Sequence, residues 1–181
     1  MNVLDPNNSL LLIIDVQEKL VNALDKNIIV KRVSNLTKSA RLLEIPVIAT
    51  EQYSKGLGKT VTDVSIEFSE NTPVFEKTSF NALAEDGVLD KIKSYKKKQI
   101  VICGIETHIC VHQTAAALLR EGFEVYTVKD ACASRNKYEF KQGIELMETN
   151  GAKVTCTEIV LFEWLKTAKN PHFKEIQALI K

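Results

Sequence analysis

Three side chains of the types used in nucleophilic catalysis each follow a short apolar run. Asp15 comes after "SLLLII", Lys77 closes "PVFEK", and Cys110 comes shortly after "KQIVICG". A thiol can attack a carbonyl carbon once a base has taken its proton, and a carboxylate is such a base. An ammonium group beside the carboxylate would hold it ionised and in position. The set therefore predicts a nucleophile, a base and an electrostatic partner, provided that the fold brings them together.

Cys110 lies in the first turn of a predicted helix, "THICVHQTAAALLREG". We expect Thr107 to be its N-cap and Gly122 to end it. The helix dipole and the unpaired N–H groups of that turn stabilise a thiolate, so we expect the pKa of Cys110 to be lowered. The same N–H groups could bind the oxyanion of an acyl-transfer intermediate.

Other interpretations of these residues stay open. A cysteine on a helix beside a sheet is most often buried filler, an aspartate after a strand is often a helix N-cap, and a single lysine is usually on the surface. His108 and His112 share one helical face, but Ile109 stands where the zinc-protease pattern requires a glutamate. The third histidine, His172, is far along the chain. A metal site is therefore disfavoured, and the roles of both helical histidines stay open.

The elements that must position these residues alternate along the chain. Strands that are apolar on both faces and alternate with helices are typical of a parallel sheet covered on both sides. We predict one doubly wound, Rossmann-like α/β domain over residues 1–181, with six parallel strands. In such folds ligands bind outside the carboxyl ends of the strands, and the first and fourth strands are neighbours, which places Asp15 near Cys110. The predicted strands span 9–17, 45–52, 72–80, 98–104, 123–130 and 152–157, and the predicted helices span 27–44, 81–95, 107–122, 137–151, 158–168 and 171–181.

Composition narrows the range of partners. Lys and Arg total 24 against 23 Asp and Glu, so a net charge of +1 gives no reason to expect nucleic acid or an anionic membrane. No apolar run approaches the ~18–20 residues of a membrane span, and "MNVLDPNNSL" lacks the features of a secretion signal. The 4 cysteines are irregularly spaced and do not suggest a disulfide framework. We therefore expect a cytoplasmic protein with neither nucleic acid nor a membrane as its partner.

The segment "EIVLFEWLKTAKNPHF" suggests self-association. It places Leu161, Phe162, Trp164 and Leu165 in one short helix, which is more apolar surface than a single buried face easily takes. We expect a homo-oligomer, a dimer or larger.

Three stretches of the sequence resemble the motifs of one enzyme superfamily. "LLIIDVQ", "FEKTSFNAL" and "VICGIETHICVHQTAAALLREGFEVYTVKDACAS" are similar to segments of the isochorismatase-like cysteine hydrolases, which include nicotinamidases and N-carbamoyl amide hydrolases. The resemblance covers residues 9–165 and implies a catalytic triad of Asp15, Lys77 and Cys110 with no cofactor. It also implies a cis peptide bond between Ile105 and Glu106, which in the family turns the N–H of Glu106 toward the substrate oxygen. That N–H and the one of Cys110 would form the oxyanion hole.

The remaining site candidates are less specific. We expect Gln17, Tyr53, Phe80 and Ile105 to bind the substrate, although Tyr53 and Phe80 could equally be core residues.

Four further residues with reactive or charged side chains are expected to lie outside the catalytic set. We expect Asp130 to be structural, as a cap in "DACAS", Cys132 to be a packed thiol and Cys103 to be buried and inert. Cys156 has no partner that the sequence assigns.

Two departures from the family narrow the reaction. True isochorismatases do not carry cysteine at the nucleophile position, so Cys110 argues against hydrolysis of a vinyl ether. Nicotinamidases hold a metal with an Asp-x-His pair after the second strand, whereas this chain has "TEQYSKGLG" there, without histidine. That stretch instead resembles the isochorismatase domain-containing proteins. We predict a metal-independent cysteine hydrolase that cleaves a small carboxamide or a related C–N bond through a thioester.

Two other classes of function compete with this prediction. The chain could be a non-catalytic binding or scaffold protein with an idle triad, or a redox-responsive protein that uses the thiol of Cys110. A redox role would usually need a resolving cysteine, and Cys103 is poorly placed for that on the other side of the turn.

Overall fold

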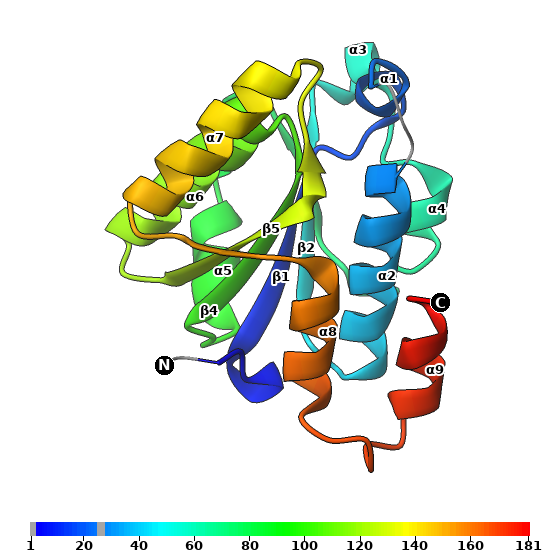
Figure 1. The fold of residues 1–181 in the computed structure, drawn as a ribbon. Helices are drawn as coiled ribbons and strands as arrows, with labels where there is room; N and C mark the ends of the chain where they lie inside the picture. The colour runs from blue at the N-terminus through cyan, green and yellow to red at the C-terminus, as the bar shows by residue number, and fades with distance from the viewer. Residues whose placement is uncertain (1–2, 25–27) are drawn as a thin grey trace.

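A parallel sheet of six strands forms the centre of the computed structural model, which describes residues 3–24 and 28–181 (Figure 1). The strands lie in the order β3-β2-β1-β4-β5-β6, and each neighbouring pair is parallel. The predicted doubly wound α/β fold is confirmed, and so is the pairing of the first strand with the fourth. The strands are β1 Ser9–Ile14, β2 Val47–Gln52, β3 Val74–Lys77, β4 Gln99–Ile105, β5 Glu124–Ala133 and β6 Lys153–Thr155.

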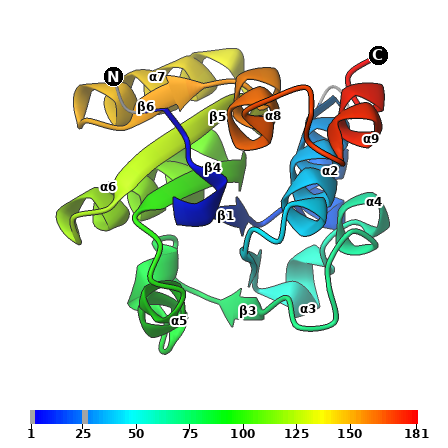
Figure 2. The ribbon, with the colours of Figure 1, turned by 90° about the horizontal axis from the view of Figure 1, so that it is seen from below.

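Helices cover both faces of this sheet. Figures 1 and 2 show α5, α6 and α7 on one face and α2, α8 and α9 on the other. Within the described residues, no helix combines the length and the apolar character needed to cross a membrane. The α-helices are α1 Glu18–Asn22, α2 Ile28–Leu42, α3 Ser54–Leu57, α4 Thr62–Ser65, α5 Val88–Ser94, α6 His112–Arg120, α7 Lys137–Thr149, α8 Thr157–Leu165 and α9 Phe173–Ala178. Single turns are η1 Pro6–Asn8, η2 Ala82–Ala84 and the π-helical turn η3 Thr107–Val111.

Burial explains why β1 and β4 form the centre of the sheet. Every residue of both strands is buried, because each strand has sheet neighbours at its two sides and helices above and below. Ile14 pairs with Gly104 at their carboxyl ends, and a Cβ atom at Gly104 would lie 1.9 Å from the carbonyl oxygen of Ile14. Only glycine lets β4 approach β1 this closely at the edge where Asp15 follows.

The helix that carries Cys110 begins differently from the prediction. The turn from Thr107 to Val111 is π-helical, and α-helical geometry starts only at His112. Glu106 is the residue before the turn, and the hydroxyl of Thr107 is buried and has no hydrogen bond within the described part of the chain. The prediction of Thr107 as N-cap was therefore wrong, whereas Gly122 does follow the end of α6 with a φ of 81°.

Candidate active site

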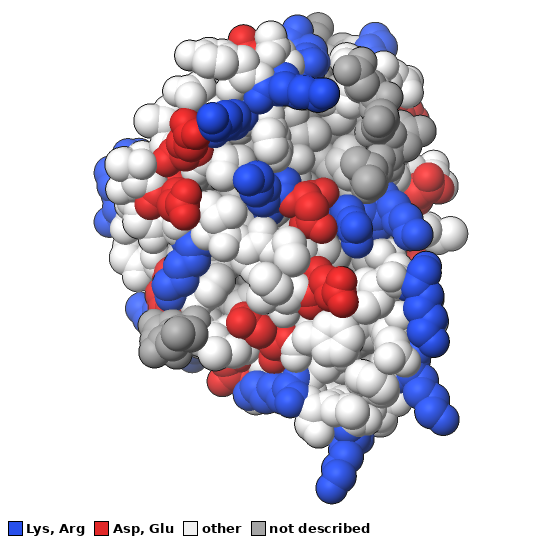
Figure 3. All heavy atoms as spheres, viewed as in Figure 1, with Lys and Arg blue, Asp and Glu red and all other residues white. Residues whose placement is uncertain are grey.

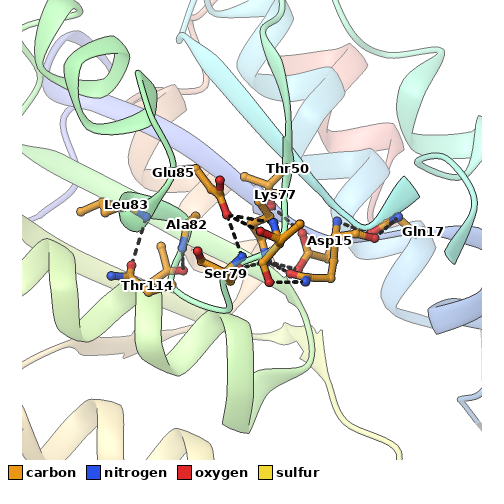
Figure 4. Close-up of polar contacts among 12 residues, drawn as sticks. Asp15, Gln17, Thr50, Lys77, Ser79, Ala82, Leu83, Glu85 and Thr114 are labelled. Atoms are coloured by element: carbon orange, nitrogen blue, oxygen red, sulfur yellow. Dashed lines mark hydrogen bonds and ion pairs between the residues drawn. The ribbon is translucent and has the colours of Figure 1, made fainter. Parts of the chain in front are cut away.

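Asp15 and Lys77 form a buried ion pair where β1, β2 and β3 end (Figure 4). Nζ of Lys77 lies 2.7 Å from Oδ2 of Asp15, and neither side chain is exposed to solvent. Nζ also donates to Oε1 of Gln52 at 2.6 Å and to the carbonyl of Ser79 at 3.2 Å. These three acceptors surround the ammonium group and hold it in position.

The two oxygens of Asp15 differ in their surroundings. Oδ1 accepts a hydrogen bond of 2.7 Å from the hydroxyl of Thr50. Oδ2 is paired with Lys77 but accepts no aligned hydrogen bond from the described residues, although it is fully buried. The close approach in that pair is thus electrostatic, and it leaves Oδ2 with lone-pair capacity for a proton donor.

The backbone turns sharply to bring Asp15 to this position. Its φ is 51°, in the left-handed region that costs of order 1–3 kcal/mol for a residue with a side chain. The N–H of Asp15 donates to the carbonyl of Thr50, and its own carbonyl accepts the N–H of Gln17 at 2.8 Å. These bonds hold the strained turn, which points the carboxylate at the end of the sheet.

Cys110 faces this ion pair and holds its proton at rest. Burial first, and the carboxylate of Asp15 second, raise the pKa of its thiol to about 12, although the ammonium of Lys77 acts in the opposite direction. The expectation of a lowered pKa was wrong, because desolvation and a nearby negative charge outweigh the N-terminal end of a helix. The resting state is therefore a neutral thiol beside a carboxylate, which is the arrangement of a nucleophile with its base.

The segment before Cys110 supplies backbone groups. The peptide bond between Ile105 and Glu106 is cis. The carbonyl of Glu106 accepts the N–H groups of Ile109 and Val111, and its carboxylate accepts both the N–H and the Nε of Arg135. The acceptors of Glu106 are thus engaged away from the thiol.

A small pocket of about 130 Å³ opens beside the thiol, and Asp15, Glu106 and Cys110 line it. Of the four predicted substrate-binding residues, Phe80 and Ile105 also line this pocket, and Phe80 is 54% exposed at its mouth. The residues that sequence reasoning did not assign to its walls are Leu20, Gln52, Leu57 and Ile109.

Gln17 and Tyr53 do not line this pocket. The amide of Gln17 donates to the carbonyls of Gln52 and Gly58 and accepts the N–H of Gln52, so it ties a loop to β2. Tyr53 is 57% exposed and its ring lies against Gly56, where a Cβ atom would come within 2.2 Å of it. The structure thus gives both residues contacts within the loop, and their contact with substrate stays a prediction.

Glu85 holds the segment between Lys77 and the pocket mouth (Figure 4). Its carboxylate accepts the N–H of Ser79 at 2.7 Å and the N–H of Thr78 at 2.8 Å. These hydrogen bonds lower the pKa of Glu85 to about 2. Ala82 N–H donates to the hydroxyl of Thr114, which fastens the same segment to α6. No local pattern identifies Glu85. Gln52, in contrast, ends a predicted strand, and that position suggests a residue near the site.

The other candidates lie outside the pocket. Asp130 accepts the N–H and the hydroxyl of Thr157 and so caps α8, which agrees with a structural role. Cys103 and Cys132 are buried, and burial raises the pKa of both thiols. In the part of the chain that the structure describes, no three His, Cys, Asp or Glu side chains gather as metal ligands.

The family to which the chain belongs follows from its relatives. The family model described as "Isochorismatase domain" matches residues 9–159. Isochorismatase family protein 1A of Dictyostelium discoideum is 41% identical over an alignment that covers 97% of this chain and 87% of the relative.

Two solved structures have the same fold along nearly their whole length. The MAR1 ribonuclease of Caenorhabditis elegans is 37% identical with a TM-score of 0.93, and the match covers 99% of this chain and 92% of that one. YcaC of Pseudomonas aeruginosa is 26% identical with a TM-score of 0.92, and the match covers 98% and 91%. Sequence and fold together place the molecule, and the chain belongs to the isochorismatase family of hydrolases.

Proposed function

We propose that this hydrolase cleaves a small carboxamide or a related C–N bond through a thioester on Cys110, without a metal or a cofactor. One observation carries the proposal: a neutral thiol lies beside a carboxylate whose Oδ2 is charge-balanced by Lys77 and accepts no aligned hydrogen bond from residues 3–24 and 28–181. Such an oxygen is prepared to accept a proton from sulfur.

The first half-reaction forms the acyl-enzyme. Asp15 accepts the proton of Cys110 while the sulfur attacks the carbonyl carbon, and the carbonyl π electrons move to oxygen. The N–H groups of Glu106 and Cys110 donate to this oxyanion. When it collapses, the C–N bond breaks and Asp15 returns the proton to the departing nitrogen, so that ammonia or an amine leaves and a thioester remains.

The second half-reaction consumes one water molecule. Asp15 takes a proton from the water molecule as the water oxygen adds to the thioester carbonyl. The C–S bond then breaks, and the sulfur recovers the proton from Asp15 as the acid departs. Lys77 takes no part in the proton transfers of either half, and it holds the carboxylate in position.

One solved structure bears on the substrate class. The YcaC structure from Pseudomonas aeruginosa contains covalent acrylamide, which is itself a small carboxamide and an electrophile.

The pKa of Cys110 bears on the competing redox-responsive role. Its raised pKa disfavours that role, because oxidation-sensitive cysteines usually have lowered pKa values. A reducing, cytoplasmic setting suits a nucleophilic thiol.

The name of the Caenorhabditis elegans structure raises RNA as another substrate. RNA binding depends on phosphate contacts, yet the net charge is +1, and Figure 3 shows acidic and basic side chains intermixed over the central part of one face. A pocket of about 130 Å³ is also small beside the several hundred Å³ of a typical ligand site. These features favour the amide over RNA.

The expected homo-oligomer rests on fewer residues than the sequence suggested. Leu161, Trp164 and Leu165 are buried within the chain, whereas Phe162 is 39% exposed and Ile159 is 50% exposed beside it. Sedimentation of the protein would test whether these two exposed residues support a dimer or a larger assembly.

The test of the proposed function is ammonia release from a panel of carboxamides and ureido compounds, with an RNA arm and with a chelator present. We expect chelator-resistant release that is lost in Cys110→Ala and in Asp15→Asn. Cys156→Ala is the matched control, because that cysteine is partly exposed and lies outside the pocket. Release that persists in Cys110→Ala, or no release from any amide, would count against the proposal.

A further inference from the structure

We propose, building on the amide hydrolysis above, that the acyl pocket accepts only short, uncharged aliphatic amides, and that Leu57 sets the limit on chain length. The inference rests on the walls of the pocket, its size and the way in which Leu57 is held.

The described walls around an acyl chain are mainly apolar. Leu20, Leu57, Phe80, Ile105 and Ile109 supply this apolar surface. The two described polar residues that line the pocket outside the triad have side chains that are already hydrogen-bonded. Gln52 accepts from Lys77 at 2.6 Å and donates to the carbonyl of Thr78 at 2.8 Å. The carboxylate of Glu106 is paired with Arg135, which is not among the residues that line this pocket.

The charge of the Asp15 carboxylate, which lines the pocket, is balanced before substrate enters. The carboxylate of Asp15 and the ammonium of Lys77 neutralise each other at 2.7 Å. A charged acyl chain would lose its hydration and find no counter-ion among the described lining residues. We therefore expect charged amides to react at least about 100-fold more slowly than neutral ones of the same length.

The pocket also limits length. Its volume is about 130 Å³. A cavity of about 150 Å³ lined by Leu, Ile and Phe can hold benzene, so this pocket should accommodate about four or five non-hydrogen atoms of an acyl chain.

Leu57 cannot readily retreat to admit a longer chain. The carbonyl of Gly58, the next residue, accepts the amide of Gln17 at 2.7 Å. Glu51 accepts both the N–H and the hydroxyl of Thr60 and pairs with Lys59 at 3.0 Å. Because the segment that follows Leu57 is fastened at both of these points, the wall that it forms is fixed.

The experiment measures kcat/KM for ammonia release from acetamide, propanamide, butanamide and hexanamide, and from the charged amides succinamate and β-alaninamide. We expect the rate to peak at three or four carbons, and to fall at least about 10-fold at six. Leu57→Ala should move the optimum to longer chains. Leu146→Ala is the matched control, because Leu146 is 49% exposed on α7, and it should leave the profile unchanged. A profile that does not move in Leu57→Ala, or that favours a charged amide, would overturn the inference while leaving the proposed function intact.

A second measurement tests the pocket without turnover. Alkylation of Cys110 by iodoacetamide and by iodoacetate is followed by peptide mass spectrometry, and each rate is divided by that of glutathione with the same reagent. We expect the neutral reagent to be favoured at least about 100-fold after this correction. Equal corrected rates would refute the exclusion of charge, whether or not any amide is hydrolysed. The absence of amide hydrolysis would count against the proposed function alone.

Discussion

Replacing Lys77 with methionine should destabilise the fold far more than an average substitution. At an effective dielectric constant of about 20, unit charges 2.7 Å apart attract by about 6 kcal/mol. Lys77→Met removes that attraction and leaves the carboxylate of Asp15 buried without its counter-ion. Breaking a buried pair from one side costs about 3–5 kcal/mol. In a chain of this size such a loss lowers Tm by about 10 °C.

The double variant separates charge from packing. Asp15→Asn combined with Lys77→Met removes both charges while keeping side chains of similar size, so it should recover at least about 2 kcal/mol relative to Lys77→Met. Gln52 and Ser79 lose the same donor in both variants, and their loss therefore cancels in the comparison.

The control is an ion pair of equal length on the surface. Nζ of Lys93 lies 2.7 Å from the carboxylate of Glu121, but the two side chains are 52% and 38% exposed. Lys93→Met should cost less than about 1 kcal/mol. Urea unfolding at neutral pH measures the unaltered protein, Lys77→Met, Asp15→Asn, the double variant and Lys93→Met. Equal costs for the two single lysine variants, or additive effects in the double variant, would refute the reasoning.

Three further predictions follow from the site. In Asp15→Asn the pKa of Cys110 should be lower than in the unaltered protein, because the carboxylate that raises this pKa is gone while Lys77 remains. The ultraviolet absorbance of the thiolate, corrected with Cys110→Ala, measures the pKa, and a value that stays at about 12 would contradict the assigned cause. Gly143→Ala should lower the free energy of unfolding in urea by about 1–3 kcal/mol and reduce amide hydrolysis, because the new Cβ would lie 2.8 Å from the Cα of His108 and push α7 away from η3. Unchanged stability and activity would rule out this tight packing. The lowered pKa of Glu85 contributes stability that is present above pH 4.5 and is lost as the pH falls toward 2. Glu85→Gln should therefore flatten this decline by about 1 kcal/mol in acid unfolding, and an equally steep decline would exclude Glu85 as its source.

Much of the fold could be predicted from sequence because its strongest signals are local. β1 and β4 are apolar at nearly every position, and only a strand covered on both faces needs such a run. Asp15 and Lys77 could be nominated because each marks the end of a strand, and the carboxyl ends of parallel strands share one edge.

The environment of each side chain could not be predicted in the same way. The pKa of Cys110 depends on burial and on a carboxylate 95 positions earlier in the chain, and neither is visible in the helix pattern around it. Gln17 lies beside the strand end as expected, but its amide meets the backbone of Gln52 and Gly58 and not the pocket. Leu57 lies in a four-residue helix that is too short to give a periodic signal.

The pairing of β1 with β4 also has a consequence for biosynthesis. Ser9 pairs with Gln99, so Asp15 and Cys110 come from segments that leave the ribosome at well-separated times. Such non-local pairing closes a long loop and forms slowly compared with local helices. An emerging chain that has exposed Asp15 and Lys77 but not yet Cys110 lacks the thiol of the proposed site. If the proposed function holds, amide cleavage cannot begin during translation before β4 and Cys110 have joined β1.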